Sequence, residues 1–249
     1  MKKGEKFEHP PLREVAFEIN FDAKLIIEEN IAKFQDQIIE DFPEYSDELA
    51  ISTVLPEGLP ENLKAQIGGK RHVFENKKRT KMIRVSNSKF NYIVKDYQDF
   101  ENYLKEVQRY CKNFCDLNAI KKFNRIGLRY INNIAIPSKN GTYNITDYVK
   151  PVIQMDRFDQ KELITFISEI RLRKVTRKLS LRTGLVAEGK WDANERVGIY
   201  ALDLDCYSDS ESEPSNLEKN IRDFHGLIED EFLSSLTDKY VNIMRTGVK

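Results

Sequence analysis

The stretch that most constrains the fold lies near the middle of the 249-residue chain. Between Lys122 and Pro137, apolar side chains alternate with charged residues or glycine: Ile126, Leu128 and Tyr130 alternate with Arg125, Gly127 and Arg129. A period of two residues is typical of a strand with one buried face. We therefore expect a central strand that ends before Pro137 and joins two halves of the chain.

The residues before this strand predict an antiparallel arrangement of strands and helices. Residues 15–21 alternate as a strand does, and residues 24–42 change to the spacing of an amphipathic helix. Residues 44–63 are typical of a surface loop because they contain two prolines and a glycine. Between residues 65 and 96 we expect a meander of short strands, followed by a helix that Asp99 is placed to cap. This order favours an antiparallel sheet over a doubly wound parallel one.

The second half predicts a further meander and a helix. Three long strands are expected at residues 163–175, 178–188 and 196–207, with a tight turn between the first two and a turn containing residues 189–194 between the last two. From residue 215 an apolar stripe predicts a long C-terminal helix that lies across the sheet.

The predicted fold class is therefore α+β, with antiparallel meander sheets and long helices packed on one face, including the C-terminal helix. Residues 1–249 are treated as a single module, and a division into two sub-halves, 1–137 and 138–249, stays open. The 40% apolar content is enough for a real core.

The amino-acid composition restricts the kinds of partner that the protein can bind and the cellular compartment in which we expect it. The 40 basic and 40 acidic residues cancel, so an electrostatic partner has to be recognised by a local patch. Three cysteines are too few for a disulfide framework and fit the reducing cytosol. Because no apolar run approaches the roughly 18 residues of a membrane span, we expect a cytoplasmic protein with no membrane partner.

Four motifs carry a resemblance that covers nearly the whole chain. They are Pro10–Val15, Arg125–Asn132, Ala201–Asp205 and Phe224–Ile228. Together they resemble a sporadically distributed family of uncharacterised prokaryotic proteins of about this length. The resemblance implies one full-length module and the patchy occurrence of genes on mobile or defence-associated islands. It supplies no catalytic residues.

Asp203 and Asp205 form the first candidate for chemistry. Two residues apart on a strand, they point to one face with roughly 7 Å between their Cα atoms. Such a pair can hold Mg²⁺ or divide acid and base roles. Arg171 and Arg173 share a face of another predicted strand, and cross-strand ion pairs with them explain the aspartates without catalysis. We favour the ion pairs and predict no metal, no cofactor and no catalytic residue.

Two predicted hairpins concentrate positive charge. If they meet in space they form a basic surface for phosphates, and otherwise they are a solvated face that discourages edge pairing. The candidate anion-binding or nucleic-acid-binding residues are Lys70, Arg71, Lys77, Lys78 and Arg79 on one hairpin, and Arg171, Arg173, Lys174, Arg177, Lys178 and Arg182 on the other.

A sheet–helix cleft is the third candidate. Its residues are Arg125, Arg129, Asp203, Asp205 and His225. Glu14 and Glu18 on the first strand neutralise the two arginines if the strands are neighbours, and otherwise the arginines are free to bind an anion. His225 is expected to be partly buried and hydrogen-bonded.

The remaining reactive side chains do not assemble a site in the sequence. Cys111 and Cys115 lie one helical turn apart on an apolar stripe and are interpreted as core residues. The three histidines lie in three different predicted elements. We therefore predict a non-enzymatic binding protein, an accessory or sensor component of a prokaryotic multi-protein system such as a defence system, with a protein partner. The alternatives are a nucleic-acid-binding subunit and a small-ligand-binding or enzymatic module, and the sequence leaves the oligomeric state open.

Overall fold

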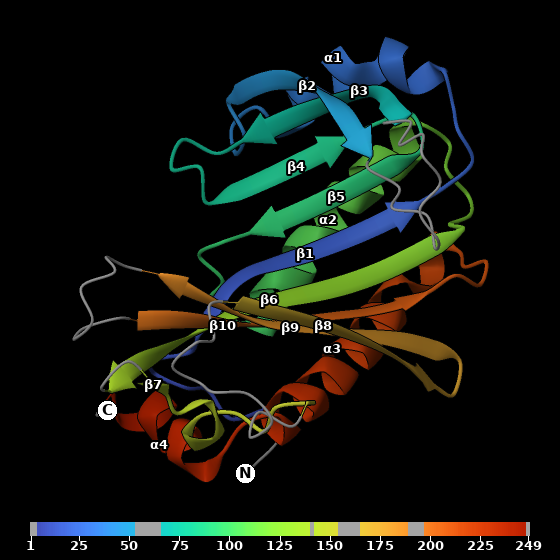
Figure 1. Cartoon of the computed structure of the whole chain (residues 1–249). Coiled ribbons are helices and arrows are strands. Elements are labelled where there is room, and N and C mark those ends of the chain that lie inside the picture. The colour runs from blue at the N-terminus through green and yellow to red at the C-terminus, as the bar shows by residue number, and fades with distance from the viewer. Residues whose placement is uncertain (1–3, 53–65, 140–141, 154–164, 189–196, 248–249) are drawn as a thin grey trace. The chain divides into compact units, whose positions relative to one another are not determined.

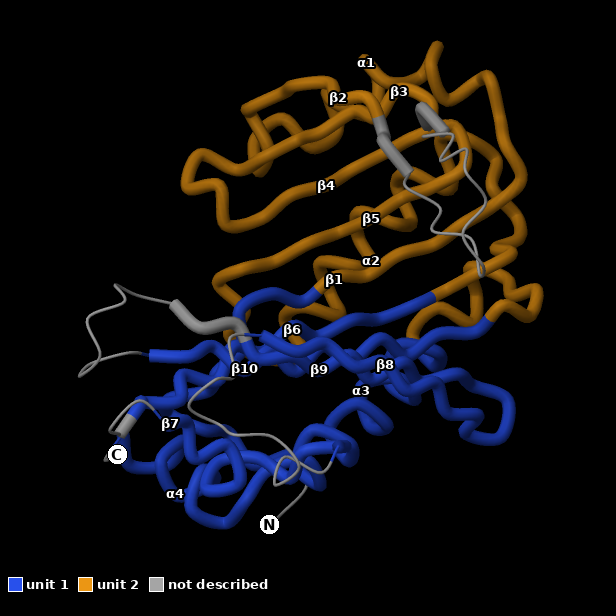
Figure 2. Tube along the Cα trace, viewed as in Figure 1, with its two compact units in different colours: residues 1–15, 127–208, 219–249 blue, residues 16–126, 209–218 orange. Residues whose placement is uncertain are grey.

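The computed structural model describes residues 4–52, 66–139, 142–153, 165–188 and 197–247 (Figure 1). The chain folds into two compact units, each assembled from separate segments (Figure 2). Unit 1 contains residues 1–15, 127–208 and 219–249, and unit 2 contains residues 16–126 and 209–218. Two strands, β1 (Leu12–Asn20) and β6 (Arg125–Lys139), each contribute residues to both units. The units divide inside β6, after residue 126.

Unit 2 is built on an antiparallel meander. Its hydrogen-bonded order is β2-β3-β4-β5-β1, and the successive pairs from β2 to β5 are antiparallel. The strands that follow β1 are β2 (Glu44–Ser52), β3 (Gln66–Glu75), β4 (Lys81–Val85) and β5 (Lys89–Val94). The helices are α1 (Ile26–Ile38) and α2 (Phe100–Leu117). The predicted order of strand, helix, meander and helix is confirmed.

An aromatic cluster joins both helices of unit 2 to one face of its strands. The Phe34 ring on α1 meets Phe74 of β3, Phe90 of β5 and Phe114 of α2 at centroid distances of 5.8, 6.4 and 5.3 Å, each edge to face. All four side chains are fully buried. Figure 1 shows α2 running behind the strands of this unit. The helix N-terminus is also as predicted, since the Asp99 carboxylate accepts the Asn102 backbone N–H at 2.8 Å.

Unit 1 contains the second predicted meander. Its strands are β8 (Thr165–Lys174), β9 (Arg177–Glu188) and β10 (Val197–Ser208). Strand β9 pairs antiparallel with both β8 and β10, and β10 also pairs with β6. The two-residue strand β7 (Thr142–Tyr143) pairs with the end of β6. Two helices follow, α3 (Leu217–Ser234) and α4 (Asp238–Thr246).

The two helices of unit 1 pack differently. The Arg177 guanidinium of β9 lies 5.2 Å from the centre of the Phe224 ring on α3, and Tyr130 of β6 contacts His225 on the same helix. In contrast, Tyr240 of α4 packs on Tyr148, which follows a short 3₁₀ turn. Helix α3 therefore covers strands, whereas α4 covers the segment around residue 148.

The antiparallel α+β class is confirmed, but the expectation of long helices is not. The α-helices of the described residues contain 9 to 18 residues, an ordinary length for globular proteins. The expected C-terminal helix is present as α3, which ends at Ser234, and it is followed by a separate helix that Thr237 caps and that was not predicted. None of the described helices has both the length and the apolarity needed to cross a membrane.

Two local predictions were wrong. Residues 44–52, expected as loop, form β2, and the rest of that predicted loop, up to residue 63, lies outside the described residues. Pro137 does not end the central strand, which continues to Lys139 and pairs there with β7. Proline lacks only the N–H donor, so a strand tolerates it where the ladder does not require that donor.

The aromatic cluster predicts a large local contribution to stability. Phe34→Ala leaves a cavity between three buried rings, so we expect the free energy of unfolding to fall by about 3–5 kcal/mol in denaturant titrations. Leu25→Ala, at an 82% exposed position just before the same helix, is the control and should change it by less than about 0.5 kcal/mol. Equal effects of the two substitutions would contradict the assignment of Phe34 to the core.

Candidate functional site

The two arginines of the central strand are both ion-paired. In unit 2, the Arg125 Nη1 donates to Glu18 Oε1 at 2.7 Å, as predicted. In unit 1, Arg129 binds Asp203 through two parallel hydrogen bonds, Nε to Oδ1 at 2.7 Å and Nη2 to Oδ2 at 2.6 Å. The hydrogen bond to Asp203 is the main cause that raises the pKa of Arg129, and the charge of Glu14 adds to it. The expected pairing is therefore confirmed for Glu18, while Asp203 is the main partner of Arg129.

Asp203 belongs to a row of alternating charges that crosses unit 1 from β6 to β8, which we call the charge ladder. Arg182, the register partner of Asp203 on β9, places Nη1 3.5 Å from Asp203 Oδ2. Arg182 Nε then pairs with Glu169 of β8 at 3.2 Å, and Glu169 pairs with Arg171 at 3.0 Å. Hydrogen bonds from Arg171 and Ser180 lower the pKa of Glu169.

The predicted partners of Asp203 were therefore wrong. Arg171 and Arg173 lie on β8, and β9 separates β8 from β10, which carries Asp203 and Asp205. Asp203 is instead bound by the guanidinium groups of Arg129 and Arg182. Asp205 lies opposite Ser180 in the register. The prediction missed this because it could not tell which strand lies next to β10 on its other side.

The basic residues of the β8–β9 hairpin are largely neutralised within unit 1. Lys174 lies 3.7 Å from Glu231, and Arg177 lies 3.3 Å from Asp223 and donates to Asn220 at 2.8 Å. Lys178 Nζ lies 5.8 Å from the centre of the Tyr207 ring. Arg173, on β8, is exposed.

The other predicted basic hairpin, β3–β4, belongs to unit 2. Lys70 pairs with Asp47 at 3.1 Å, and Arg71 pairs with Glu48 at 3.0 Å, both across the β2–β3 ladder. Residues 77–79, with Lys77, Lys78 and Arg79, form the turn after β3. The two sets of cations thus belong to different units, and acidic neighbours compensate many of them.

The remaining predicted residues behave as core or structural groups. His225 is half-buried and its Nδ1 lies 3.1 Å from the Tyr130 hydroxyl. Cys111 and Cys115 are buried with their sulfurs 3.9 Å apart, and the hydrogen bond between them, together with burial, raises the pKa of Cys111. Within the described part of the chain, no group of three or more His, Cys, Asp or Glu side chains is arranged to hold a metal ion.

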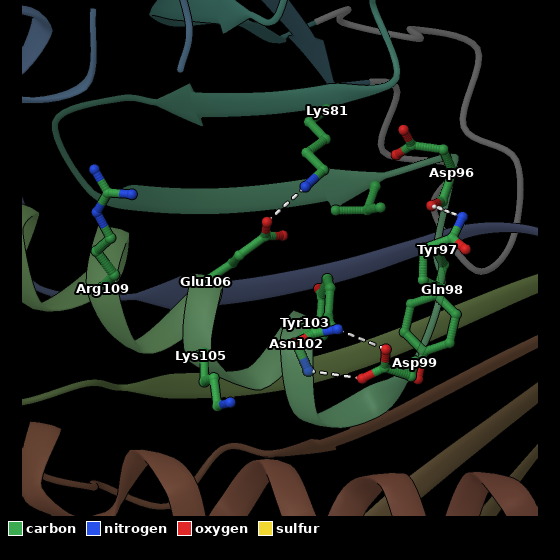
Figure 3. A pocket seen from close by; sticks show the side chains of 11 residues that line it. Lys81, Asp96, Tyr97, Gln98, Asp99, Asn102, Tyr103, Lys105, Glu106 and Arg109 are labelled. Carbon is green, nitrogen blue, oxygen red and sulfur yellow. Dashed lines mark hydrogen bonds and ion pairs between the residues drawn. The ribbon is translucent and has the colours of Figure 1, made fainter. Parts of the chain in front are cut away.

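A pocket that sequence reasoning missed lies in unit 2 and has a volume of about 430 Å³ (Figure 3). Its walls are the β4 and β5 strands, the connection between β5 and α2, and the first turns of α2. The lining residues are Lys81, Val94, Asp96, Tyr97, Gln98, Asp99, Asn102, Tyr103, Lys105, Glu106 and Arg109.

The polar side chains of this pocket are held in place by hydrogen bonds and ion pairs to other residues of unit 2. Lys81 Nζ donates to Glu106 Oε1 at 2.5 Å, and the buried Tyr92 hydroxyl donates to the other oxygen of Glu106 at 2.6 Å. Asp96 accepts from Thr80 at 2.8 Å, and Asp99 accepts from the Asn102 side chain at 2.7 Å. The walls are therefore preorganised.

Tyrosine rings complete the lining. Tyr97 and Tyr103 lie with their centroids 5.8 Å apart, and Tyr103 stacks on Tyr92 at 5.6 Å. Burial, followed by the hydrogen bond to Glu106, raises the pKa of Tyr92 far above its ordinary value, so the phenol stays a proton donor. In the sequence, the only signal was the run of polar and aromatic residues 96–99 between a strand and a helix, of which Asp99 alone was interpreted, as a cap.

Comparison with known proteins adds no relative to this picture. No protein-family model and no curated protein matches the chain.

The charge ladder predicts a stability difference between two arginines. Arg129→Met leaves the nearly buried carboxylate of Asp203 without its bidentate partner, so we expect a loss of about 2 kcal/mol in the free energy of unfolding, measured by denaturant titration. Arg171→Met removes the exposed end of the same ladder and should cost less than about 1 kcal/mol. A smaller loss for Arg129→Met than for Arg171→Met would contradict the structural role of the bidentate pair.

Proposed function

We propose that this protein works by binding, as an accessory or sensor component of a prokaryotic multi-protein system, and that the pocket of unit 2 takes a small, uncharged ligand rich in hydroxyl groups. The observation that carries the proposal is the balanced polar lining of a pocket of about 430 Å³. The prokaryotic and defence setting comes from the resemblance of the sequence motifs.

The charges of the lining favour a neutral ligand. The cations Lys81, Lys105 and Arg109 are matched by the anions Asp96, Asp99 and Glu106. A ligand with net charge gains from one set and is repelled by the other. A hydroxyl group both donates and accepts, so it can be satisfied by amine, amide and carboxylate side chains alike.

The remaining lining residues fit the same class. Gln98 and Asn102 present amides, which match hydroxyl groups in both donor and acceptor roles. Tyr97 supplies a half-buried ring against which the C–H face of a sugar can pack. The volume lies inside the usual range of small-ligand sites, roughly 300–1,000 Å³. A saccharide or another polyol therefore suits the pocket better than an apolar or an anionic molecule.

Thermal unfolding tests this proposal directly. A neutral saccharide that binds the native pocket should raise the unfolding temperature in proportion to the logarithm of its concentration. Tyr97→Ala removes the ring and should abolish the shift, whereas Arg173→Ala, in unit 1, should preserve it. If a panel of neutral sugars and polyols leaves the unfolding temperature unchanged while charged metabolites raise it, the proposed ligand class is wrong.

A second candidate function, binding of a protein partner, is favoured by the tip of the β8–β9 hairpin. Val175 occupies the first position of the turn, with φ of 57°, and is 93% exposed. A β-branched residue in the left-handed region is disfavoured, and an exposed valine gains nothing from burial to offset that cost. On the same hairpin Ile167 is 82% exposed.

The surroundings of this tip suit an acidic and apolar partner surface. Exposed Arg173 lies close to the turn, and β8 comes last in the hydrogen-bonded order of the strands that the structure describes in unit 1. A strand edge and exposed apolar side chains are typical features of protein recognition. Nucleic-acid binding is less favoured because many of the predicted basic residues already pair with carboxylates.

Val175→Asn changes both the backbone strain of the turn and the apolar side chain that it exposes, and each change has its own measurement. Asparagine tolerates the left-handed conformation, so we expect the free energy of unfolding to rise by about 1 kcal/mol in denaturant titrations. Affinity capture from a native lysate should lose any partner that the hairpin tip holds. A partner retained equally by the wild type and by Val175→Asn would show that the tip is not its binding surface.

A further inference from the structure

Three side chains of unit 2, from three different elements, form a hydrogen-bonded relay. Glu28 on α1 places Oε2 3.0 Å from Nε2 of His72 on β3. The other ring nitrogen of His72, Nδ1, lies 2.9 Å from the hydroxyl of Tyr45 on β2. The Tyr45 and His72 rings are also nearly parallel, with an interplanar angle of 23°. We call this set the Tyr45 relay.

The chemistry of the three groups determines where the protons lie. The Glu28 carboxylate only accepts, so the Nε2 of a neutral His72 carries the hydrogen and donates it. Nδ1 then has a free electron pair and accepts the hydroxyl hydrogen of Tyr45. This is the arrangement in which an imidazole, held by a carboxylate on one side, withdraws a proton from a hydroxyl on the other.

Exposure distinguishes the base from the group it acts on. The His72 side chain is 3% exposed, so bulk water hardly reaches the imidazole. Tyr45 is 43% exposed, so this residue, unlike His72, can be approached from solvent. In unit 1, Tyr130 makes a comparable bond to His225, but Tyr130 is buried. The Tyr45 relay therefore combines a buried base with a partly exposed tyrosine.

The charges around the relay favour an uncharged electrophile. Asp47 is the register partner of His72 and pairs with Lys70 at 3.1 Å. Glu28 adds a second carboxylate beside the imidazole. With two acids and one lysine, this patch repels an anionic phosphoryl donor more than it repels a neutral ester.

We propose that Tyr45 is a nucleophilic residue that accepts an acyl group from a neutral ester or thioester, with His72 as its general base and Glu28 as the positioning residue. The Tyr45 oxygen forms a bond to the acyl carbon, and the bond from that carbon to the leaving oxygen or sulfur breaks. The phenol proton passes to His72 Nδ1 and then to the leaving group. The product is an O-acyl tyrosine at a site separate from the pocket lining.

Reaction of the full chain with p-nitrophenyl acetate tests the proposal. Nitrophenolate release gives the rate, and mass spectrometry of peptides gives the position of the acetyl group. We expect Tyr45 to be acetylated faster than the other tyrosines, and His72→Gln to lower the rate by roughly a hundredfold, the usual contribution of a general base. In Tyr45→Phe, the peptide that contains position 45 should carry no acetyl group. The matched control, His225→Gln, should acetylate Tyr45 at the wild-type rate.

Glu28→Gln provides the second variant, because His72 is buried and its replacement can unfold the unit. Glu28 is 43% exposed, and glutamine preserves its shape while removing the charge. A several-fold lower acetylation rate at an unchanged unfolding temperature supports the positioning role. Wild-type acetylation of Tyr45 in folded His72→Gln, or in Glu28→Gln if the histidine variant unfolds, overturns the proposal. Acetylation of Tyr45 no faster than that of other exposed tyrosines overturns it too.

Discussion

The alternation of side chains along the strands is the constraint on which the rest of this structure depends. On β6, Ile126, Leu128 and Tyr130 are buried, while Arg125 and Arg129 point to the opposite face, where each meets a carboxylate. An arginine in the sheet is tolerable only because its charge is paired and its hydrogen bonds are made. The same rule continues through Asp203, Arg182 and Glu169 on the neighbouring strands of unit 1. The buried apolar residues and the paired charged residues thus both follow from the alternation of side chains between the two faces of each strand.

Local patterns were sufficient to predict most elements, because the information lies within a few residues. The spacing of Ile27, Ile31, Phe34 and Ile38 predicts α1, and Asp99 predicts the start of α2. The failures occurred where local signals conflict. Pro137 is a strand breaker by its missing N–H, yet the strand continues past it. In β2, Tyr45 and Leu49 alternate with polar residues, but Asp47 stands at the position between them where the pattern requires an apolar residue.

Which strands lie next to each other in the sheet could not be predicted in the same way, because local sequence patterns do not determine it. Asp203 was assigned to the arginines of β8 because both lie in the second meander. Its bidentate partner is Arg129, 74 residues earlier in the chain. The pocket has the same origin: Lys81 and Glu106 are 25 residues apart and meet only when β4 packs beside α2. Contacts between residues so far apart in the sequence follow from tertiary packing, so the spacing of residues does not predict them.

Buried polar groups show how such packing produces chemistry. His72 is nearly inaccessible, so both of its ring nitrogens need partners from the protein, and Glu28 and Tyr45 supply them. Satisfying the ring on both sides also fixes its tautomer, which turns one nitrogen toward a phenol as an acceptor. In Tyr130 and His225 the phenol is buried, so a similar bond serves packing. Exposure of the tyrosine, rather than the presence of the histidine, is therefore what distinguishes the proposed reactive relay from a structural one.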